Sequence, residues 1–113
     1  YLELGVPFGF GTDNKPFNPF MTLWSAVARQ ERQTGKELAP EQRLSRWDAL
    51  KAFTLGGAYF SFDEDRRGSL EPGKLADLLV VDGDPLSDVG VLANKDRLLV
   101  IMQGGRAHKD LVS

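Results

Sequence analysis

The stretch that decides the fold is Gly-Ser-Leu-Glu-Pro-Gly-Lys-Leu-Ala-Asp-Leu-Leu-Val-Val-Asp, residues 68–82. Pro72 has the fixed φ that suits the second position of a type II turn, and Gly73 supplies the positive φ needed at the third. The apolar run 78–81 follows and ends at Asp82, a pattern typical of a short strand buried on both faces. The sequence therefore predicts a tight turn that leads into a core strand.

A first helix is predicted well before this stretch, with Asn18 as its N-cap and Pro19 at its first position. Gly35 is expected to end this helix. Cations gather towards that end, where they favour the helix dipole: Arg29, Arg32 and Lys36. Apolar residues recur at the spacing of one buried helix face: Phe20, Leu23, Trp24 and Val27.

A second helix is predicted to begin at Ser45, with Asp48 as a capping-box partner three residues later. A short turn or helical piece is expected before it, at residues 40–43. The pair Gly56 and Gly57 is expected to break this helix. Its apolar face is expected to consist of Trp47, Leu50 and Phe53.

Strands dominate the end of the chain. Residues 97–103 contain the apolar run of a second core strand, Leu-Leu-Val-Ile-Met. The pair Gly104 and Gly105 is a two-residue hairpin signal, so residues 106–111 are expected to pair back as a more exposed strand. Because helices come first and strands follow, the order favours an α+β fold over alternating βαβ units.

The composition excludes several function classes. The chain has 113 residues, 14 basic and 16 acidic residues, and a formal charge of −2. Both signs are interspersed, so no basic stripe is available for nucleic acid. No apolar stretch is long enough to span a membrane, and no secretory signal is visible. The absence of cysteine suits a cytoplasmic protein. Since the first residue is not Met, the chain is expected to be processed or cut from a longer protein.

Asp13 is the main candidate for chemistry. It follows a weak predicted strand, residues 6–10, in which Pro7 lacks a donor and Gly9 leaves no side chain. Such a strand usually lies where another segment comes close. An Asp in this place is commonly a turn or cap residue. Alternatively, it is a carboxylate at the carboxyl end of a barrel strand, able to bind a metal or accept a proton from metal-bound water.

A series of motifs, in order, resembles the metal-dependent amidohydrolase superfamily, in particular its branch with the N-substituted formamide deformylases. Gly-Phe-Gly-Thr-Asp at 9–13 resembles the final barrel strand of that superfamily, which ends in a functional aspartate. The other matching segments are Asn18-Pro19 with its helix, Ser-Arg-Trp-Asp-Ala-Leu at 45–50, Thr-Leu-Gly-Gly-Ala at 54–58, residues 68–82, and Val-Ile-Met-Gln-Gly-Gly-Arg at 100–106.

The resemblance implies a fold and an activity. Residues 1–67 would form the last strand and covering helices of a (β/α)8 barrel, and residues 68–113 strands of a small composite β-sandwich domain. The parent enzyme would hydrolyse a C–N bond of a small amide-like substrate with water activated by a divalent metal, zinc in our interpretation. Asp13 would bind this metal or shuttle the proton. This chain alone is expected to be inactive and to hold no metal.

Two departures from the superfamily qualify that reading. The loop Asn-Lys-Pro-Phe at 14–17 replaces a Trp-Pro pair, so substrate contacts there do not carry over. The histidine ligands of the superfamily lie upstream and are absent here. The only histidine, His108, is expected to be a surface residue, since zinc needs three or four convergent ligands.

A second hypothesis remains open beside the enzyme. The missing histidines suit a free-standing structural or interaction module without catalysis. On either hypothesis, helices shaped to cover a barrel would expose large apolar side chains, which tend to find partners. We therefore expect a homo-oligomer and no nucleic-acid or membrane partner.

Overall fold

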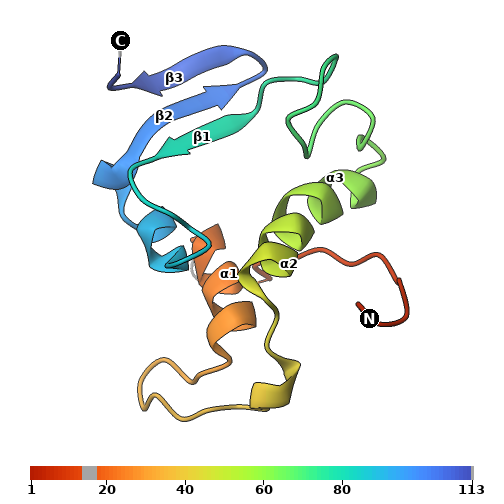
Figure 1. Cartoon of the computed structure of the whole chain (residues 1–113), viewed down its shortest axis with the longest axis vertical. Coiled ribbons are helices and arrows are strands. Elements are labelled where there is room, and N and C mark those ends of the chain that lie inside the picture. Colours follow the sequence, from red (N-terminus) through yellow and green to blue (C-terminus); the bar gives the residue numbers. More distant parts are fainter. Residues whose placement is uncertain (14–17, 113) are drawn as a thin grey trace.

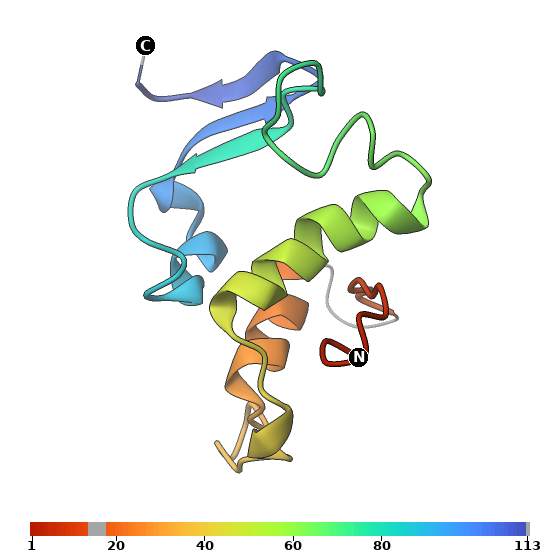
Figure 2. The same ribbon diagram turned by 45° about the vertical axis from the view of Figure 1, so that its right-hand side comes forward.

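The computed structural model describes residues 1–13 and 18–112 of the chain. Helices occupy the first half and a three-stranded antiparallel sheet the second, so the predicted α+β class is confirmed (Figure 1). Figure 2 shows the sheet at one end of the molecule and the helices at the other. Within the described residues, no helix is both long enough and apolar enough to cross a membrane.

Helix α1 spans Pro19–Ala28, and its predicted N-cap is confirmed: Asn18 Oδ1 accepts a hydrogen bond from Phe20 N at 3.0 Å. The predicted end at Gly35 is wrong. Arg29 adopts a left-handed conformation with φ of 50° and ends the helix. The three cations expected in the last turn therefore lie at or beyond the helix end.

The loop after α1 explains this early end. Gln30 forms an isolated antiparallel bridge with Glu37, which turns the chain back on itself. The Glu31 carboxylate accepts hydrogen bonds from the N–H groups of Gln33 and Thr34. Such local bonds offer the backbone an alternative to continuing the helix. The short 3₁₀ helix η1, Pro40–Gln42, follows and confirms the piece predicted there.

A single bent helix follows, made of α2 (Arg46–Lys51), the π-helical turn η2 (Ala52–Gly56) and α3 (Gly57–Phe60). Ser45 caps it as predicted, since its Oγ accepts from Asp48 N at 3.1 Å. The predicted break at Gly56 and Gly57 is wrong, because both keep helical φ angles of −60° and −62°. A helical glycine costs only about 1 kcal/mol, which tertiary contacts can offset.

The apolar face of this helix also differs from prediction. Trp47 is 60% exposed, whereas Ala49 is fully buried and Ala52 is 5% exposed. Leu50 and Phe53 do pack against the core as expected. Small residues therefore make the closest helix contacts, and the largest side chain points away from them.

The sheet has the strand order β1-β2-β3, with β1 at Leu78–Val81, β2 at Leu98–Gln103 and β3 at Arg106–Asp110. The turn before β1 is confirmed: Lys74 N donates to Glu71 O at 3.1 Å, and Gly73 has a φ of 91°. The hairpin between β2 and β3 is confirmed as well, with positive φ at both of its glycines.

Strand β1 is not buried on both faces, which corrects the prediction. Leu79 is 42% exposed and Val80 is 40% exposed. The reason is positional, because β1 is an edge strand and only the middle strand β2 is flanked on both sides. The fully enclosed sheet residues, Leu98 and Val100, belong to β2.

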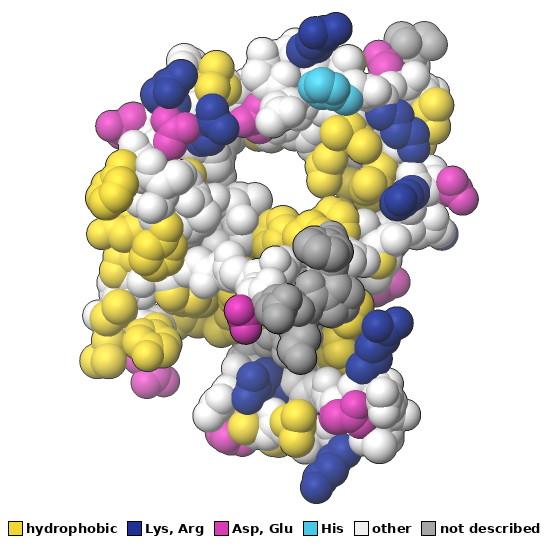
Figure 3. Space-filling view, turned by 180° about the vertical axis from the view of Figure 1, so that it is seen from behind, with side chains coloured by type: hydrophobic (Ala, Val, Ile, Leu, Met, Phe, Trp, Pro, Cys, Tyr) yellow, Lys and Arg dark blue, Asp and Glu magenta, His cyan; other side chains and the backbone are white. Residues whose placement is uncertain are grey.

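Two 3₁₀ helices, η3 (Val89–Ala93) and η4 (Lys95–Arg97), connect β1 to β2. The core cluster joins α1, α2 and η3 through four buried residues: Leu23, Ala49, Val89 and Leu92. Elsewhere the helices and the sheet stand apart, and a cavity of about 510 Å³ lies between them. Figure 3 shows an opening through the molecule with hydrophobic side chains beside it.

Candidate functional site

The candidate site begins with an extended segment, residues 6–12, that precedes Asp13. The predicted strand at 6–10 is wrong, because this segment joins no ladder among the described residues. It instead lies along the side of the α2–α3 helix that faces away from the sheet (Figures 1 and 2). Phe10 anchors it by packing against the core cluster. The ring of Phe8 meets that of Phe10 edge-on, with centroids 6.3 Å apart.

The predicted close approach occurs at Gly9. A Cβ placed on Gly9 would lie 3.0 Å from the carbonyl carbon of Gly56 and 3.1 Å from a ring carbon of Phe60. Such distances are tighter than ordinary Cβ contacts, so a side chain at Gly9 would require its neighbours to shift by a few tenths of an ångström. The segment and the helix meet closely here because residue 9 is glycine.

Asp13 follows this contact at the end of the segment. It has a left-handed backbone, with a φ of 48°, and its side chain is exposed. Asp and Asn are the non-glycine residues that adopt this conformation most readily. The backbone therefore suits a turn residue, and the exposure leaves the carboxylate accessible. The divergent loop at 14–17 lies outside the described residues.

The described residues do not by themselves form a metal-binding group. In the described part of the chain, no group of three or more His, Asp or Glu side chains converges on one point. His108 lies exposed on β3, as expected, and β3 is the outer strand of the sheet. The segment that carries Asp13 lies on the other side of the helix from the sheet (Figure 2). Asp13 is thus a single carboxylate, whereas zinc needs three or four ligands.

The aspartates after β1 are turn residues. The Asp84 carboxylate accepts hydrogen bonds from Leu86 N and the Ser87 hydroxyl, which together hold the pKa of Asp84 below its ordinary value. Asp88 Oδ1 accepts from Gly90 N at 2.8 Å and caps η3. Both aspartates therefore act as local turn and cap residues.

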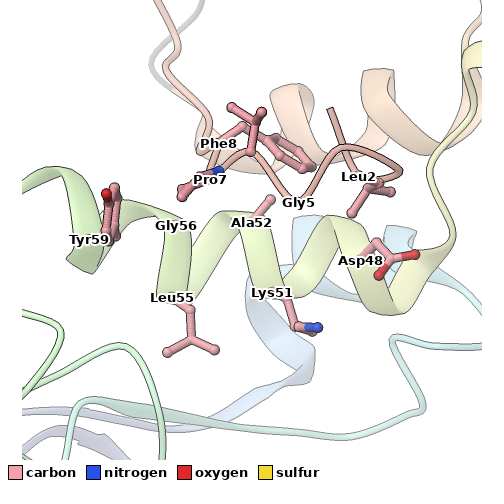
Figure 4. Close-up of a pocket in the computed structure, with 11 residues that line it drawn as sticks. Leu2, Gly5, Pro7, Phe8, Asp48, Lys51, Ala52, Leu55, Gly56 and Tyr59 are labelled. Carbon is pink, nitrogen blue, oxygen red and sulfur yellow. The ribbon is translucent and has the colours of Figure 1, made fainter.

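A cavity of about 300 Å³ lies between the N-terminal segment and the helix (Figure 4). Its walls are mostly apolar and include Leu2, Val6, Phe8, Ala52 and Leu55. Figure 4 shows Lys51 and Asp48 on the same stretch of helix, with Tyr59 further along. Asp13 is not among the residues that line it, so this cavity and the candidate carboxylate are separate features.

The arrangement has a limited chemical repertoire. Asp13 can accept or donate a proton, or supply one ligand, at the end of a segment fixed by Phe10 and by the Gly9 contact. The larger cavity between helices and sheet has mostly apolar walls, from residues such as Phe53, Leu70 and Leu79. The catalytic role of Asp13 stays a prediction.

Comparison with known proteins identifies the family. The profile of the amidohydrolase family matches residues 1–104, which is most of the chain. The N-substituted formamide deformylase of Arthrobacter pascens is 36% identical over 87 residues, which cover 75% of this chain and 16% of the deformylase. An imidazolonepropionase of Syntrophobacter fumaroxidans is 38% identical over 82 residues, 73% of this chain and 18% of that enzyme.

Solved structures agree with this result. The A. niger ochratoxinase matches with a TM-score of 0.73 and 26% identity, over 96% of this chain and 23% of that chain. A prolidase complexed with N-methylphosphonate-L-proline matches with a TM-score of 0.67 and 28% identity, over 97% of this chain and 24% of its own. The chain belongs to the amidohydrolase family, and it spans less than a fifth of the length of the two curated relatives above.

One feature of the site was absent from the sequence predictions. The Gly56 side of the close contact was not foreseen, because the Gly-Gly pair was interpreted as a helix break. The helical stretches on both sides of the pair were the available signal, since a glycine inside a helix commonly has a packing reason.

Proposed function

We propose that this chain is the C-terminal part of an amidohydrolase that hydrolyses the C–N bond of a small amide-like substrate. The observation that carries the proposal is the family match across residues 1–104, within which Asp13 ends the extended segment. On this proposal, the segment would form the last strand of a (β/α)8 barrel once it pairs with strands outside this chain, and the sheet would belong to the composite β domain. Asp13 would then lie at the carboxyl end of that strand, where barrel enzymes place their chemistry.

Asp13 is the residue to which we assign the chemistry. An exposed carboxylate at the end of an anchored segment can accept a proton from the attacking water and pass it to the leaving nitrogen. We propose that the complete enzyme uses a divalent metal, zinc, to activate that water. Since the described residues include no convergent ligand group, we propose that the metal is held mainly by residues outside this chain. The chain alone would then be inactive.

The test uses the protein expressed from its complete reading frame. Bound metal is measured by elemental analysis, and hydrolysis is assayed on a panel of N-substituted formamides and other small amides. We expect Asp13→Asn to lower kcat by about 10²–10⁴, the usual contribution of general acid–base catalysis. The matched control is Asp65→Asn, which removes an exposed carboxylate from the loop after α3 and should leave kcat unchanged. Full activity in Asp13→Asn would remove the assigned role.

The alternative is a non-catalytic structural or interaction module. It is favoured by the lack of a convergent ligand group among the described residues. Reading the DNA upstream of Tyr1 separates the two proposals. An in-frame stop codon immediately before Tyr1 would favour the module, and a His-x-His motif further upstream would favour the enzyme.

A further inference from the structure

Packing contacts hold the segment that carries Asp13 against the helix and the core cluster. Among the described residues, no strand pairs with residues 6–12. The backbone bond from Val6 N to Tyr1 O, at 3.1 Å, lies at the start of the segment and does not reach Asp13. The packing contacts of Gly9 and Phe10 lie between this bond and Asp13.

The contact between Gly9 and Gly56 is tight from both sides. A Cβ on Gly56 would overlap the carbonyl oxygen of Phe8 and would lie 3.0 Å from the Cα of Gly9. A Cβ on Gly9 would lie 3.0 Å from the carbonyl carbon of Gly56. Because backbone atoms form both sides, neither could yield by rotating a side chain. A methyl group at either position must move the segment or the helix.

The π-helical turn brings Gly56 to this place. It spans Ala52–Gly56, with Gly56 as its last residue. A π turn holds one residue more than an α turn, so it shifts the register of the residues that follow by one position. In a continuous α-helix, the place beside Phe8 would fall to Leu55, whose side chain could not fit there. The additional residue of the π turn and the glycine at position 56 are therefore both needed for the close contact.

Gly57 provides an internal comparison. It has the same helical backbone as Gly56, with a φ of −62° against −60°. A Cβ on Gly57 would meet nothing within 4 Å. The two neighbours thus have equal helix propensity and differ in one respect, which is contact with the segment.

We propose that Gly56 is a positioning residue for Asp13. By letting the helix touch the backbone at Phe8 and Gly9, it fixes the distance of the segment from the helix. Asp13 is four residues beyond Gly9, so a displacement at the contact is carried along a short extended chain to the carboxylate. This inference rests on the proposed function, because the effect on catalysis requires Asp13 to act there. A misplacement of about 1 Å can reduce catalysis by about 10²-fold.

The first measurement concerns position and needs no activity. Amide resonances of the ¹⁵N-labelled 113-residue chain are compared between wild type, Gly56→Ala and Gly57→Ala. We expect Gly56→Ala to shift the resonances of Gly9, Phe10 and Asp13, and Gly57→Ala to leave them in place. Equal shifts in the two variants would overturn the proposal.

The second measurement concerns catalysis in the protein from the complete reading frame. We expect Gly56→Ala to lower kcat at least tenfold with KM within twofold, because substrate still binds while the carboxylate is misplaced. Gly57→Ala should keep both constants within twofold. A moved Asp13 resonance with unchanged kcat would overturn the catalytic consequence.

A variant on the other side of the contact keeps the proposal testable if Gly56→Ala does not fold. Gly9→Ala places its methyl against the same backbone from outside the helix and should give the same split between kcat and KM. The double variant should be little worse than the poorer single one, since a contact can be lost only once. If the fold-losses of the two single variants multiply in the double variant, the two glycines do not act through one shared contact. If wild type hydrolyses none of the substrates, the proposed function fails, and the resonance shifts still decide whether Gly56 positions Asp13.

Discussion

The helical region and the sheet differ in how they bury their apolar residues. Helices α1 and α2 meet η3 in a cluster whose members Leu23 and Ala49 are fully enclosed. In the sheet, the middle strand β2 buries Leu98 and Val100, whereas β1 leaves Leu79 at 42% and Val80 at 40% exposure. A run of four apolar residues is therefore no guarantee of burial.

The difference follows from where each element has neighbours. An amphipathic helix needs one packing partner for its apolar stripe, and α1 finds it in α2 and η3. An apolar strand needs cover on two faces and a neighbour on each edge. The described chain supplies β1 with one neighbour, β2, and leaves a cavity of about 510 Å³ beside it.

The largest expected effect concerns the buried residues of the helical core cluster. Leu23→Ala should lower the free energy of unfolding by about 3 kcal/mol, because it leaves a cavity in a cluster that has little room to collapse. Leu79→Ala, on the exposed strand, should cost about 1 kcal/mol or less. Urea unfolding followed by tryptophan fluorescence measures both. Equal losses would mean that β1 is as well packed as α1.

A second prediction concerns the exposed apolar side chains of the helix and of strand β1. We expect the chain to be a dimer or larger at micromolar concentration, because Trp47 and the uncharged edge strand β1 present apolar surface. The double variant Trp47→Lys, Leu79→Lys should shift the mass towards the monomer in light scattering. Gln33→Lys, in an exposed polar loop, is the control for added charge. A monomeric wild type would contradict the prediction.

The smallest effect concerns pH. Hydrogen bonds from the Ser87 hydroxyl and Leu86 N lower the pKa of Asp84, and the Lys74 ammonium with the Ser69 hydroxyl lowers that of Glu71. A carboxyl with a lowered pKa in the folded state adds stability above its unfolded pKa, and this stability is lost as pH falls through the folded pKa. Both residues flank the sheet, in the turns before and after β1.

Urea midpoints at about pH 7 and about pH 2 measure this contribution. Asp84→Asn should lower the midpoint at neutral pH and make little difference in acid. In the helical region, Glu31 is held by Thr34 and Gln33 in the same way, so Glu31→Gln is the matched variant. A midpoint loss in Asp84→Asn that is independent of pH would rule out the carboxylate charge as the cause.

Local chemistry explains most of the predictions that succeeded. Asn18 and Ser45 cap their helices through side-chain oxygens, and Gly73 takes the positive φ of its turn. Each of these roles depends on a few neighbouring residues, so the sequence contains the whole cause. The division at residue 67 and the role of Asp13 stay predictions, since both concern a larger protein.

The predictions that were wrong have other causes. Arg29 ends α1 because the following loop pairs with itself, and Trp47 is exposed because the closest helix contacts use Ala49 and Ala52. The Gly56-Gly57 pair looked like a helix break because glycine has poor helix propensity. At Trp47 and at the Gly-Gly pair, contacts between segments distant in sequence outweighed a local preference, whereas α1 ends through bonds within the loop that follows it.

The sequence by itself determined the class of fold, the caps, the turns and the amidohydrolase resemblance, because each depends on residue types at short spacing. The tertiary structure alone decided that Ala49 and Ala52 are buried while Trp47 is exposed, and that Gly9 and Gly56 meet between the segment and the helix. Those facts depend on which backbones meet, and Gly9 and Gly56 are 47 residues apart. A propensity describes one residue in its local chain, whereas this contact exists only once the helix and the segment have packed.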